Sequence, residues 1–326
     1  MPICQYYILS VELQKKFLKK LKQKNKRLNT AAIIGPSGIG VAHLRELIKF
    51  GIKNIGLVGK KFRKDRVNIL AKKNKNLEFS NLRSIEEIKR LKPNLINVCS
   101  PTKYHYKHIQ IIKTFSKNLI IEKPLFWIKD KKKSNFKIAK KLLNQNINRI
   151  FINLPMISLA NQIKKKNKLA LVDKLEFSYF TNGKNNFNNI AVDLLPHALS
   201  FLFTLSSNKL VNFSIKEIIK KKNLWNCKIL INDCFCKFFF KQHPKRLSSR
   251  LSFKINNDTY LRKQFIKDGI YINKILINKK KIINIKNPMT DYLNLILKNL
   301  YNKNILKKNN KVTLNSIKIM EKLVNH

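Results

Sequence analysis

The sequence predicts an α/β protein of two domains, the first built on a doubly wound parallel sheet and the second on a large, mostly antiparallel sheet. The chain has 326 residues, of which 44% are hydrophobic, and this is enough for two cores of ordinary size. Short, continuously apolar runs alternate with helical stretches over residues 31–152, a pattern typical of parallel strands buried on both faces. From residue 153 onward strand-like runs follow one another, which indicates antiparallel pairing.

The first domain is expected over residues 31–152. Strands are predicted at AAIIG, NIGLVG, NLINVCSP, KNLIIEKP and RIFINLP. Helices are predicted at VAHLRELIKFG, SIEEIKRL, HYKHIQIIKTFS and KKSNFKIAKKLLNQ, and Gly51 is expected to terminate the first of them. This alternation of strand and helix predicts a doubly wound domain.

The second domain is expected over residues 153–326, as an α/β domain. Its strands are predicted at KLEFSYF, LVNFSIKEII, CKILIND, CFCKFFFK, RLSFKIN, YLRKQFI, YINKILI and KIINI. Two helices should close the chain, at DYLNLILKNLY and VTLNSIKIMEKLVN, with Thr313 or Asn315 capping the second.

Residues 1–30 are expected to form a basic extension ahead of these domains. The run VELQKKFLKKLKQKNKRL has apolar residues at helical spacing, and such a helix could touch an anionic membrane surface. A solvated or weakly packed helix is favoured over membrane contact, because its apolar face is thin and lysine dominates.

The formal net charge of +52 raises the possibility of nucleic-acid binding. The excess is almost all lysine, is accompanied by abundant Asn and Ile, and runs from one end of the chain to the other rather than along one patch. All three residues have A/T-rich codons, so base composition explains the charge without a specific nucleic-acid partner. The run Lys237-Phe-Phe-Phe-Lys241 could suggest base stacking, but a buried strand fits it better.

Cysteine usage and hydropathy narrow the class further. The five cysteines form no CxxC pair and have no histidine at zinc-ligand spacing, so no metal is expected and reduced, packed thiols fit. No apolar stretch reaches the length of a membrane span, and the first residues lack the pattern of a secretory signal. A cytoplasmic protein is therefore expected.

The end of the first strand carries a candidate nucleotide-binding loop. In the dinucleotide pattern G-x-G-x-x-G, Gly35 and Gly40 take the outer positions and Ser37 replaces the middle glycine, with Gly38 and Ile39 beside it. The Ser37 hydroxyl could donate to a phosphate oxygen at the helix N-terminus. Because a strand precedes the loop and a helix follows it, we expect a Rossmann domain that binds NAD or NADP.

The second strand bears on the choice between the two cofactors. An acid about 20 residues after the glycines would bind the ribose 2′-hydroxyl of NAD, whereas basic groups suit the 2′-phosphate of NADP. The chain has Lys60 and Arg63 at this point and no acid, which favours NADP. The Gly-Ile-Gly ending is also found in short-chain dehydrogenases, but the Tyr-x-x-x-Lys pair that those enzymes need is absent from the sequence.

Two further strand ends carry a family resemblance. The fourth strand ends in CSPT, with Ser100 and Thr102, and His105 follows; the fifth ends in EKPL, with Glu122 and Lys123. Together they resemble the A-T-P-N-x-x-H and E-K-P-L motifs of the Gfo/Idh/MocA oxidoreductases. The resemblance implies that the first loop and Glu122 lie along the nicotinamide ribose, and that Lys123 reaches the reacting centre. An ammonium there can polarise a substrate oxygen and stabilise an alkoxide.

A third motif lies in the second domain. If Pro196 is in the first turn of a helix, Asp193 and His197 lie four residues apart at its N-terminus, where the carboxylate can orient the imidazole. The family carries D-x-x-x-H at this place, so the resemblance makes His197 the proton-transfer residue and Asp193 its partner or a substrate ligand. The glycine-rich lead-in of the family is replaced by Asn188-Asn189-Ile190.

These motifs lead to one functional hypothesis and two alternatives. The resemblance implies hydride transfer between a nicotinamide and a sugar, sugar nucleotide or polyol, by a homo-oligomer, a dimer or larger, formed through the open face of the second sheet. An NADPH-dependent imine reductase on the same fold is one alternative. The other is a non-catalytic nucleotide- or nucleic-acid-binding protein that uses the basic surface.

Overall fold

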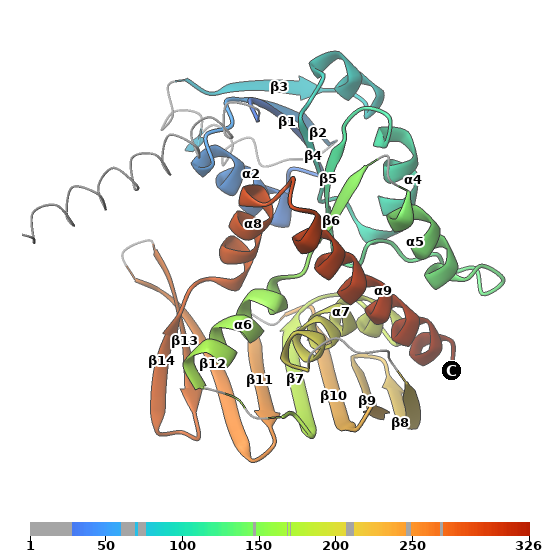
Figure 1. Ribbon diagram of the computed structural model, residues 1–326, viewed down its shortest axis with the longest axis vertical. Helices are drawn as coiled ribbons and strands as arrows, with labels where there is room; N and C mark the ends of the chain where they lie inside the picture. The colour runs from blue at the N-terminus through green and yellow to red at the C-terminus, as the bar shows by residue number, and fades with distance from the viewer. Residues whose placement is uncertain are drawn as a thin grey trace, which may run out of the picture. The chain divides into compact units, whose positions relative to one another are not determined.

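The structure is a computed structural model, and it describes residues 28–326 with the exception of 60–68, 71–75, 146–147, 168, 170, 207–211, 246–248 and 268–269. Its described residues form two sheets with helices packed beside them (Figure 1). The basic helix expected within residues 1–30 falls in the part that is not described, so it stays a prediction.

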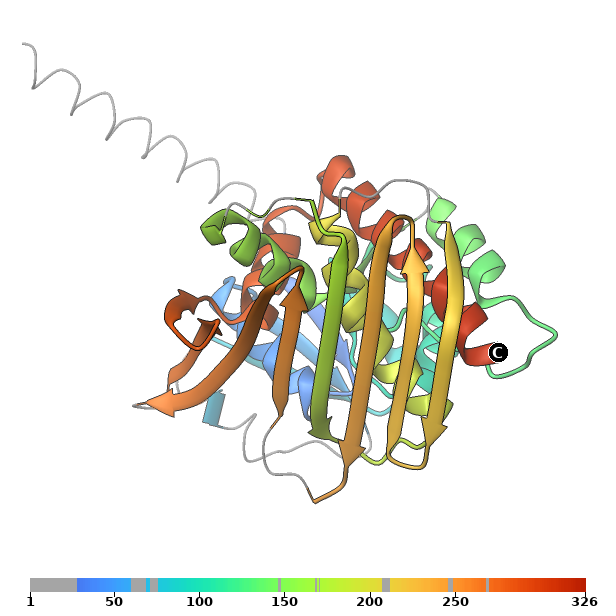
Figure 2. The same cartoon turned by 90° about the horizontal axis from the view of Figure 1, so that it is seen from below.

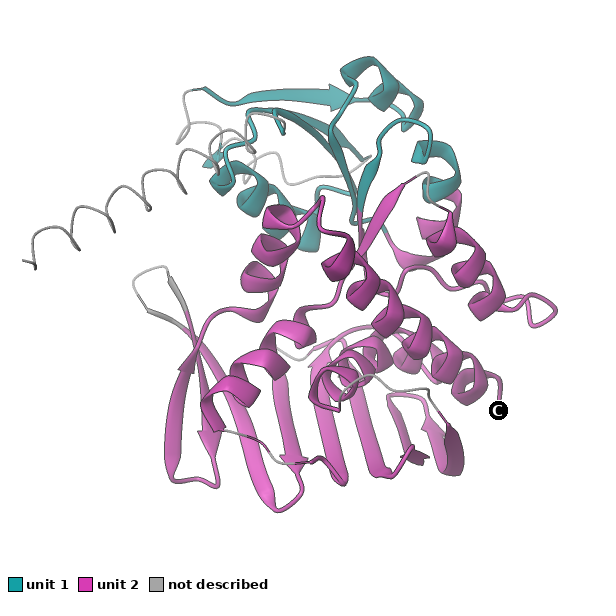
Figure 3. Ribbon diagram, viewed as in Figure 1, with its two compact units in different colours: residues 1–100, 108–119 teal, residues 101–107, 120–326 magenta. Residues whose placement is uncertain are grey.

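The chain divides into two compact units (Figure 3). The first runs to Ser100 and includes His108–Leu119, and the second consists of Pro101–Lys107 and Ile120–His326. The domain boundaries expected at residues 30 and 152 remain predictions.

The N-terminal sheet is parallel, as predicted. It has six strands in the order β3-β2-β1-β4-β5-β6, which is the Rossmann order. Their bounds are β1 (Thr30–Ile34), β2 (Asn54–Val58), β3 (Glu78–Leu82), β4 (Leu95–Val98), β5 (Asn118–Glu122) and β6 (Arg149–Asn153). Every residue of β4 and β5 is buried, which explains their continuous apolar runs. The strand β3 was not expected, because it is an edge strand with an exposed and partly polar sequence.

The helices that accompany this sheet depart from the expected bounds by a few residues at their starts and ends. They are α2 (Ile39–Lys49), the 3₁₀ helix η1 (Glu86–Leu91), α4 (Thr102–Ile112) and α5 (Asn135–Asn144). Gly51 has a positive φ of 92° and its N–H donates to the Ile48 carbonyl at 2.9 Å, so the predicted C-terminal glycine is confirmed. The segment SIEEIKRL is a 3₁₀ rather than an α-helix.

The second sheet has eight strands in the order β14-β13-β12-β11-β7-β10-β9-β8. Neighbours pair antiparallel except β7 and β10, which are parallel, so the expectation of a mostly antiparallel sheet is confirmed. The bounds are β7 (Lys174–Asn182), β8 (Phe213–Lys221), β9 (Leu224–Ile231), β10 (Cys234–His243), β11 (Arg250–Ile255), β12 (Asp258–Lys267), β13 (Ile270–Ile277) and β14 (Lys281–Ile285).

One face of this sheet is covered by helices, and the other is free of them in the described chain (Figure 2). The helices that follow β6 along the chain are α6 (Pro155–Asn167), α7 (Asn188–Leu205), α8 (Pro288–Lys298) and α9 (Lys303–Asn325). Strand β10 shows the alternation that results: Phe238 and Phe240 are fully buried on the helix side, while Lys237 and Lys241 are exposed on the other. The basic-aromatic run is therefore a strand core, as expected.

The cap expected for the last helix is wrong. Asn302 caps α9, because its side chain accepts from the backbone N–H of Asn304 and of Ile305, and the helix continues through Thr313. The helix persists through a run of asparagines because Asn309 is 2% exposed and hydrogen-bonds the backbone of Ile152 through both its side-chain oxygen and its nitrogen. Tertiary contacts thus outweigh low local helix propensity.

Two further expectations concern the whole chain. The four cysteines of the described residues are buried and not joined in disulfides, while Cys4 lies outside them. Within the described part, no helix is both long enough and apolar enough to cross a membrane.

Candidate functional site

The glycine loop after β1 is closely packed at both ends. Gly35 has a φ of 84°, and a Cβ there would lie 2.8 Å from the backbone nitrogen of Ser100. A Cβ on Gly40 would overlap the carbonyl oxygen of Gly35. Only glycine fits at these two positions, as the dinucleotide pattern requires of its turn and packing residues.

The middle of the loop is open. Gly38 has a φ of 51° and no atom of the described chain lies within 4 Å of its Cβ position. It is the N-cap of α2 and provides no side-chain hydrogen bond, while the backbone N–H of Gly40 donates to the Ser37 carbonyl oxygen at 2.9 Å. Ser37 and Ile39 are exposed on the same loop. An exposed glycine turn at the N-terminus of a helix fits the pyrophosphate of a dinucleotide.

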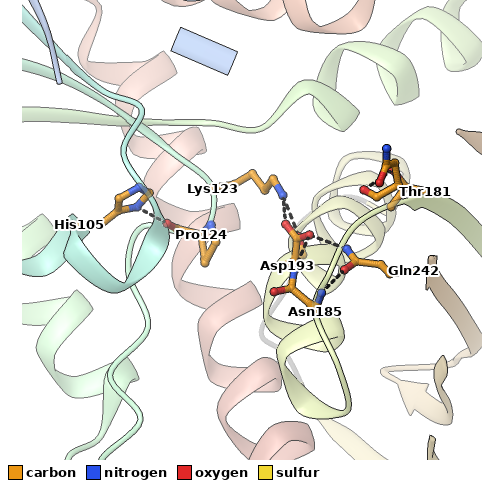
Figure 4. Close-up of polar contacts among 8 residues, drawn as sticks. His105, Lys123, Pro124, Thr181, Asn185, Asp193 and Gln242 are labelled. Atoms are coloured by element: carbon orange, nitrogen blue, oxygen red, sulfur yellow. Dashed lines mark hydrogen bonds and ion pairs between the residues drawn. The ribbon is translucent and has the colours of Figure 1, made fainter. Parts of the chain in front are cut away.

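The remaining expected cofactor residues have different surroundings. Ser100 Oγ lies 2.9 Å from His108 Nδ1, and Thr102 is the first residue of α4. His105 is 1% exposed, and its Nδ1 lies 3.0 Å from the carbonyl oxygen of Pro124, so it holds the loop that follows Lys123 (Figure 4). Lys60 and Arg63 are outside the described residues.

Lys123, directly after β5, forms an ion pair with Asp193 of α7 (Figure 4). Its Nζ lies 2.6 Å from Asp193 Oδ1 and also donates to the Asp193 carbonyl oxygen at 2.9 Å. The side chains are 15% and 34% exposed, respectively. The two residues expected from separate motifs are thus brought into direct contact.

The second carboxylate oxygen of Asp193 is held by two amides that were not expected. Gln242 Nε2 donates to Oδ2 at 2.6 Å and Asn185 Nδ2 at 3.2 Å, and Gln242 Oε1 accepts from the Asn185 backbone at 3.2 Å. Gln242 is 1% exposed at the end of β10, and a side chain on Gly183 would overlap its amide. The alternation CFCKFFFKQH places Gln242 on the buried face with Phe240, and this signal could have identified it.

The expected helix N-terminus around Pro196 is wrong. Helix α7 begins at Asn188, so Pro196 lies inside it, and Asp193 and His197 are on its middle turns. A proline within a helix has no N–H for the carbonyl four residues earlier, here that of Val192, and its ring opens the helix at that point. The carbonyl of the next residue, Asp193, is the one that accepts from Lys123.

His197 lies against an aromatic ring and beside the ion pair. Its imidazole makes an edge contact with Tyr179 of β7, with ring centroids 5.5 Å apart. Burial and then the charge of Lys123 lower the pKa of His197 from 6.5 to about 3, although the Asp193 carboxylate acts in the opposite direction. The hydrogen bonds of that carboxylate go to Lys123, Gln242 and Asn185 and not to the imidazole.

The ion pair keeps both of its members charged. Burial acts to lower the pKa of Lys123, but the Asp193 carboxylate and its hydrogen bond raise it above 10.5. Burial acts to raise the pKa of Asp193, but Lys123 holds it below 3.8. At neutral pH the site therefore contains an ammonium, a carboxylate and a neutral imidazole.

Glu122 and a cavity complete the surroundings. Glu122 is 7% exposed, and its Oε1 accepts from Asn153 Nδ2 at 2.6 Å; Asn153, at the end of β6, was not expected. A cavity of about 690 Å³ borders Asp193 and is lined by Thr102, Trp127 and Asn189 among others. A group of a small molecule can therefore lie beside the ion pair.

Residues 28–142 match the sequence model of the Gfo/Idh/MocA oxidoreductases, described as an oxidoreductase family with an NAD-binding Rossmann fold. Residues 28–142 therefore carry the sequence of a Gfo/Idh/MocA Rossmann domain. The family resemblance and the oxidoreductase class expected from the motifs are confirmed. A search of curated protein sequences finds no match.

Solved structures of this fold cover nearly the whole chain. The oxidoreductase yvaA of Bacillus subtilis has 13% identity and a TM-score of 0.64, covering 91% of this chain and 96% of its own. The biliverdin reductase of Synechocystis, in complex with biliverdin and NADP⁺, has 10% identity and a TM-score of 0.60 over 91% and 98%. The WlbA dehydrogenase of Thermus thermophilus, in complex with NAD and UDP-GlcNAcA, has 13% identity and a TM-score of 0.60 over 91% and 95%. At these identities the likeness is one of fold.

Proposed function

We propose that this Gfo/Idh/MocA oxidoreductase transfers a hydride between a nicotinamide cofactor and a carbon that bears a hydroxyl, or the matching carbonyl, in a sugar, sugar nucleotide or polyol. The observation that carries the proposal is the partly buried Lys123–Asp193 pair beside the neutral imidazole of His197. A fixed positive charge and a proton acceptor at one place are what alcohol oxidation and carbonyl reduction require.

Lys123 is proposed to bind the reacting oxygen. Its ammonium stays charged because Asp193 raises its pKa, so it can stabilise the negative charge that develops on that oxygen around hydride transfer. Asp193, fixed by Gln242 and Asn185, keeps Lys123 in position through the carboxylate and the backbone carbonyl.

His197 is proposed to move the proton. In the neutral form it takes the hydroxyl proton during oxidation and returns it during reduction. Tyr179 holds the ring by its edge contact, and Asp193 contributes its negative charge without a direct hydrogen bond.

The cofactor is proposed to be NADP in preference to NAD, because Lys60 and Arg63 follow the second strand and residues 59–63 contain no acid. The cofactor supplies or accepts the hydride. Its pyrophosphate would lie on the loop of Gly35, Ser37, Gly38, Ile39 and Gly40. The roles of Ser100, Thr102, His105 and Glu122 near its ribose are carried over from the family resemblance, with His105 acting through the Pro124 carbonyl.

Association through the helix-free face of the second sheet and a cytoplasmic location are part of the same proposal. The first rests on the open sheet face (Figure 2), and the second on the reduced, buried thiols. The proposed protein partner is a second copy of the chain, and the proposed ligand is a small molecule.

The test is a titration of the full chain with NADPH and NADH, followed by nicotinamide fluorescence, and then a substrate screen. We expect NADPH to bind more tightly than NADH, and Lys60→Asp to weaken NADPH selectively. Lys123→Met and His197→Asn should keep nucleotide binding and each lower turnover by about 10²-fold or more. Lys140→Met, an exposed lysine on α5, is the control and should change neither.

Different outcomes favour the alternatives. Oxidation of NADPH by cyclic imines and not by carbonyl sugars would favour the imine reductase. Failure of folded protein to bind either nucleotide, together with salt-sensitive binding of DNA or RNA that survives Lys123→Met, would favour the non-catalytic binding protein.

A further inference from the structure

Arg262 of β12 stands on the same face of the second sheet as the proposed site. Leu251 of β11 pairs with Tyr179 on one side and with Arg262 on the other, and residues paired across strands share a face. At about 4.8 Å per strand, Arg262 is roughly 10 Å along the sheet from Tyr179. Tyr179 in turn contacts His197, so Arg262 belongs to the His197 side of the sheet.

The hydrogen bonds of Arg262 go to neutral amides. Its Nη2 donates to Asn273 Oδ1 at 2.7 Å and to Gln264 Oε1 at 3.1 Å, and its Nε donates to Asn273 Oδ1 at 3.3 Å. Among the residues described, no carboxylate lies within 4.0 Å of the guanidinium. The side chain is half-buried, and burial lowers the pKa of this arginine. A half-buried cation without a counter-charge is unfavourable, because the guanidinium cannot neutralise itself by losing a proton.

Two hydrogen-bond donors at this place have no acceptor in the described chain. Nη1 of Arg262 makes no hydrogen bond there. Asn273 is 3% exposed, its oxygen is committed to Arg262, and its Nδ2 is buried without a partner. Leaving such a donor unsatisfied is unfavourable, so an acceptor supplied by a ligand would be favourable at this place.

We propose that Arg262, positioned by Asn273 and Gln264, binds an anionic group of the substrate, a carboxylate or a phosphate, in the same site as Lys123 and His197. This rests on the proposed function and names the substrate class more narrowly: a sugar acid or a sugar phosphate rather than a neutral polyol. The planar fork of a guanidinium matches both oxyanions. The charge of Arg262 also acts to lower the pKa of His197, which is consistent with a short distance between them.

A neighbouring lysine allows the position of Arg262 to be tested separately from its charge. Lys263 follows it on β12, is exposed, and stands on the opposite face of the strand. It therefore shares the local backbone and the charge of Arg262 but not its place on the inner face. Lys263→Gln is a matched control for Arg262→Gln.

The experiment is isothermal titration of the full chain with D-glucuronate, D-glucose 6-phosphate and neutral D-glucose, at fixed moderate salt. We expect at least one anionic sugar to bind about tenfold or more tightly than glucose. Arg262→Gln should abolish that preference, Arg262→Lys should keep only part of it, and Lys263→Gln should leave it unchanged. Thermal melts of all variants verify that they are folded.

The proposal is overturned if glucose binds as tightly as both anionic sugars, if neither anionic sugar binds at millimolar concentration, or if Arg262→Gln and Lys263→Gln reduce the preference equally. Titration needs no turnover, so its result is separate from that of the proposed function. Anion binding through Arg262 without hydride transfer to any substrate would leave this site standing and overturn the oxidoreductase mechanism.

Discussion

Lys123 Nζ contacts Asp193 twice, at 2.6 Å through the carboxylate and at 2.9 Å through the backbone carbonyl. One residue of α7 thus fixes both the charge and the direction of the lysine at the end of β5. The carbonyl is in the part of the helix where Pro196 removes a donor from the preceding carbonyl. Pro196 leaves the Val192 carbonyl without its helical donor, and Lys123 donates to the next carbonyl, that of Asp193.

Asp193→Asn should destabilise the protein through the lysine it leaves behind. The side chain of Lys123 is 15% exposed, and removing the opposite charge leaves a poorly solvated ammonium. We expect the free energy of unfolding to fall by about 2–3 kcal/mol, less than for a fully buried pair, because water reaches part of Asp193. Thermal denaturation at pH 7 measures the change.

Glu217→Gln is the matched control for this variant. Lys228 Nζ lies 2.6 Å from Glu217 Oε2, the same distance, but the side chains are 46% and 38% exposed. We expect the free energy of unfolding to fall by less than about 1 kcal/mol in this control.

Because the pKa of Asp193 is held below 3.8, the difference in stability between wild type and Asp193→Asn should persist above pH 3.8 and shrink as the pH falls through the lowered pKa. Equal losses in the two variants would contradict a special role for burial.

His197 should make the folded state sensitive to acid. Its pKa is about 3 when folded and 6.5 ordinarily, so the unfolded chain binds a proton that the folded chain excludes. Stability is therefore fully present above pH 6.5 and declines as the pH falls from 6.5 toward 3. We expect the melting temperature of His197→Asn to depend less on pH over this window than that of the wild type. His243→Asn, at an exposed position of β10, is the control and should keep the pH dependence of the wild-type melting temperature.

Removing the charge of Lys123 should shift the pKa of His197. Lys123 is the largest cause of the low pKa of His197 after burial, so Lys123→Met should raise that pKa toward 6.5. The ¹H–¹³C resonances of the imidazole, followed between pH 4 and 8, report it directly. An unchanged titration would mean that burial alone keeps the ring neutral.

The sequence predicted the parts of the fold that depend on local pattern. Continuous apolar runs identified the buried parallel strands, and alternation identified every strand of the second sheet. Strand β3 was missed because an edge strand needs no apolar run, and the start of α9 because Asn309 is kept helical by its bonds to β6. Neither cause is visible in a short window of sequence.

The candidate site likewise contains residues that local sequence predicted and residues that it did not. Lys123, Asp193 and His197 were found because each belongs to a motif at a strand end or at helical spacing. Asn185 and Gln242 were not, because their relation to Asp193 depends on which strands are neighbours in the sheet and in which register. The hydrogen-bond partners of a candidate site residue depend on tertiary structure, whereas the residue itself can be recognised in a local motif.

Gly38→Ala tests the nucleotide loop against a control on the same helix. Gly38, before α2, and Gly51, after it, both have a positive φ, and neither would place a Cβ within 4 Å of another described atom. Each alanine should cost about 1–2 kcal/mol from backbone strain alone, seen as similar drops in melting temperature. Only Gly38→Ala should weaken NADPH or NADH, by about tenfold or more, because its Cβ enters the proposed pyrophosphate site. Equal weakening by Gly51→Ala would remove the loop from the cofactor site.

The buried thiols should react in a defined order in a Cys4→Ser protein. Cys234 is 5% exposed, and a hydrogen bond from the Cys236 thiol, with Sγ atoms 3.6 Å apart, lowers its pKa. Burial raises the pKa of Cys227 to about 12, so almost no thiolate is present there at pH 8. Iodoacetamide labelling of native protein, read by mass spectrometry, should modify Cys234 first and Cys227 last. Simultaneous modification of both would show instead that the reagent enters through opening of the second sheet, in which case thiol acidity does not set the order.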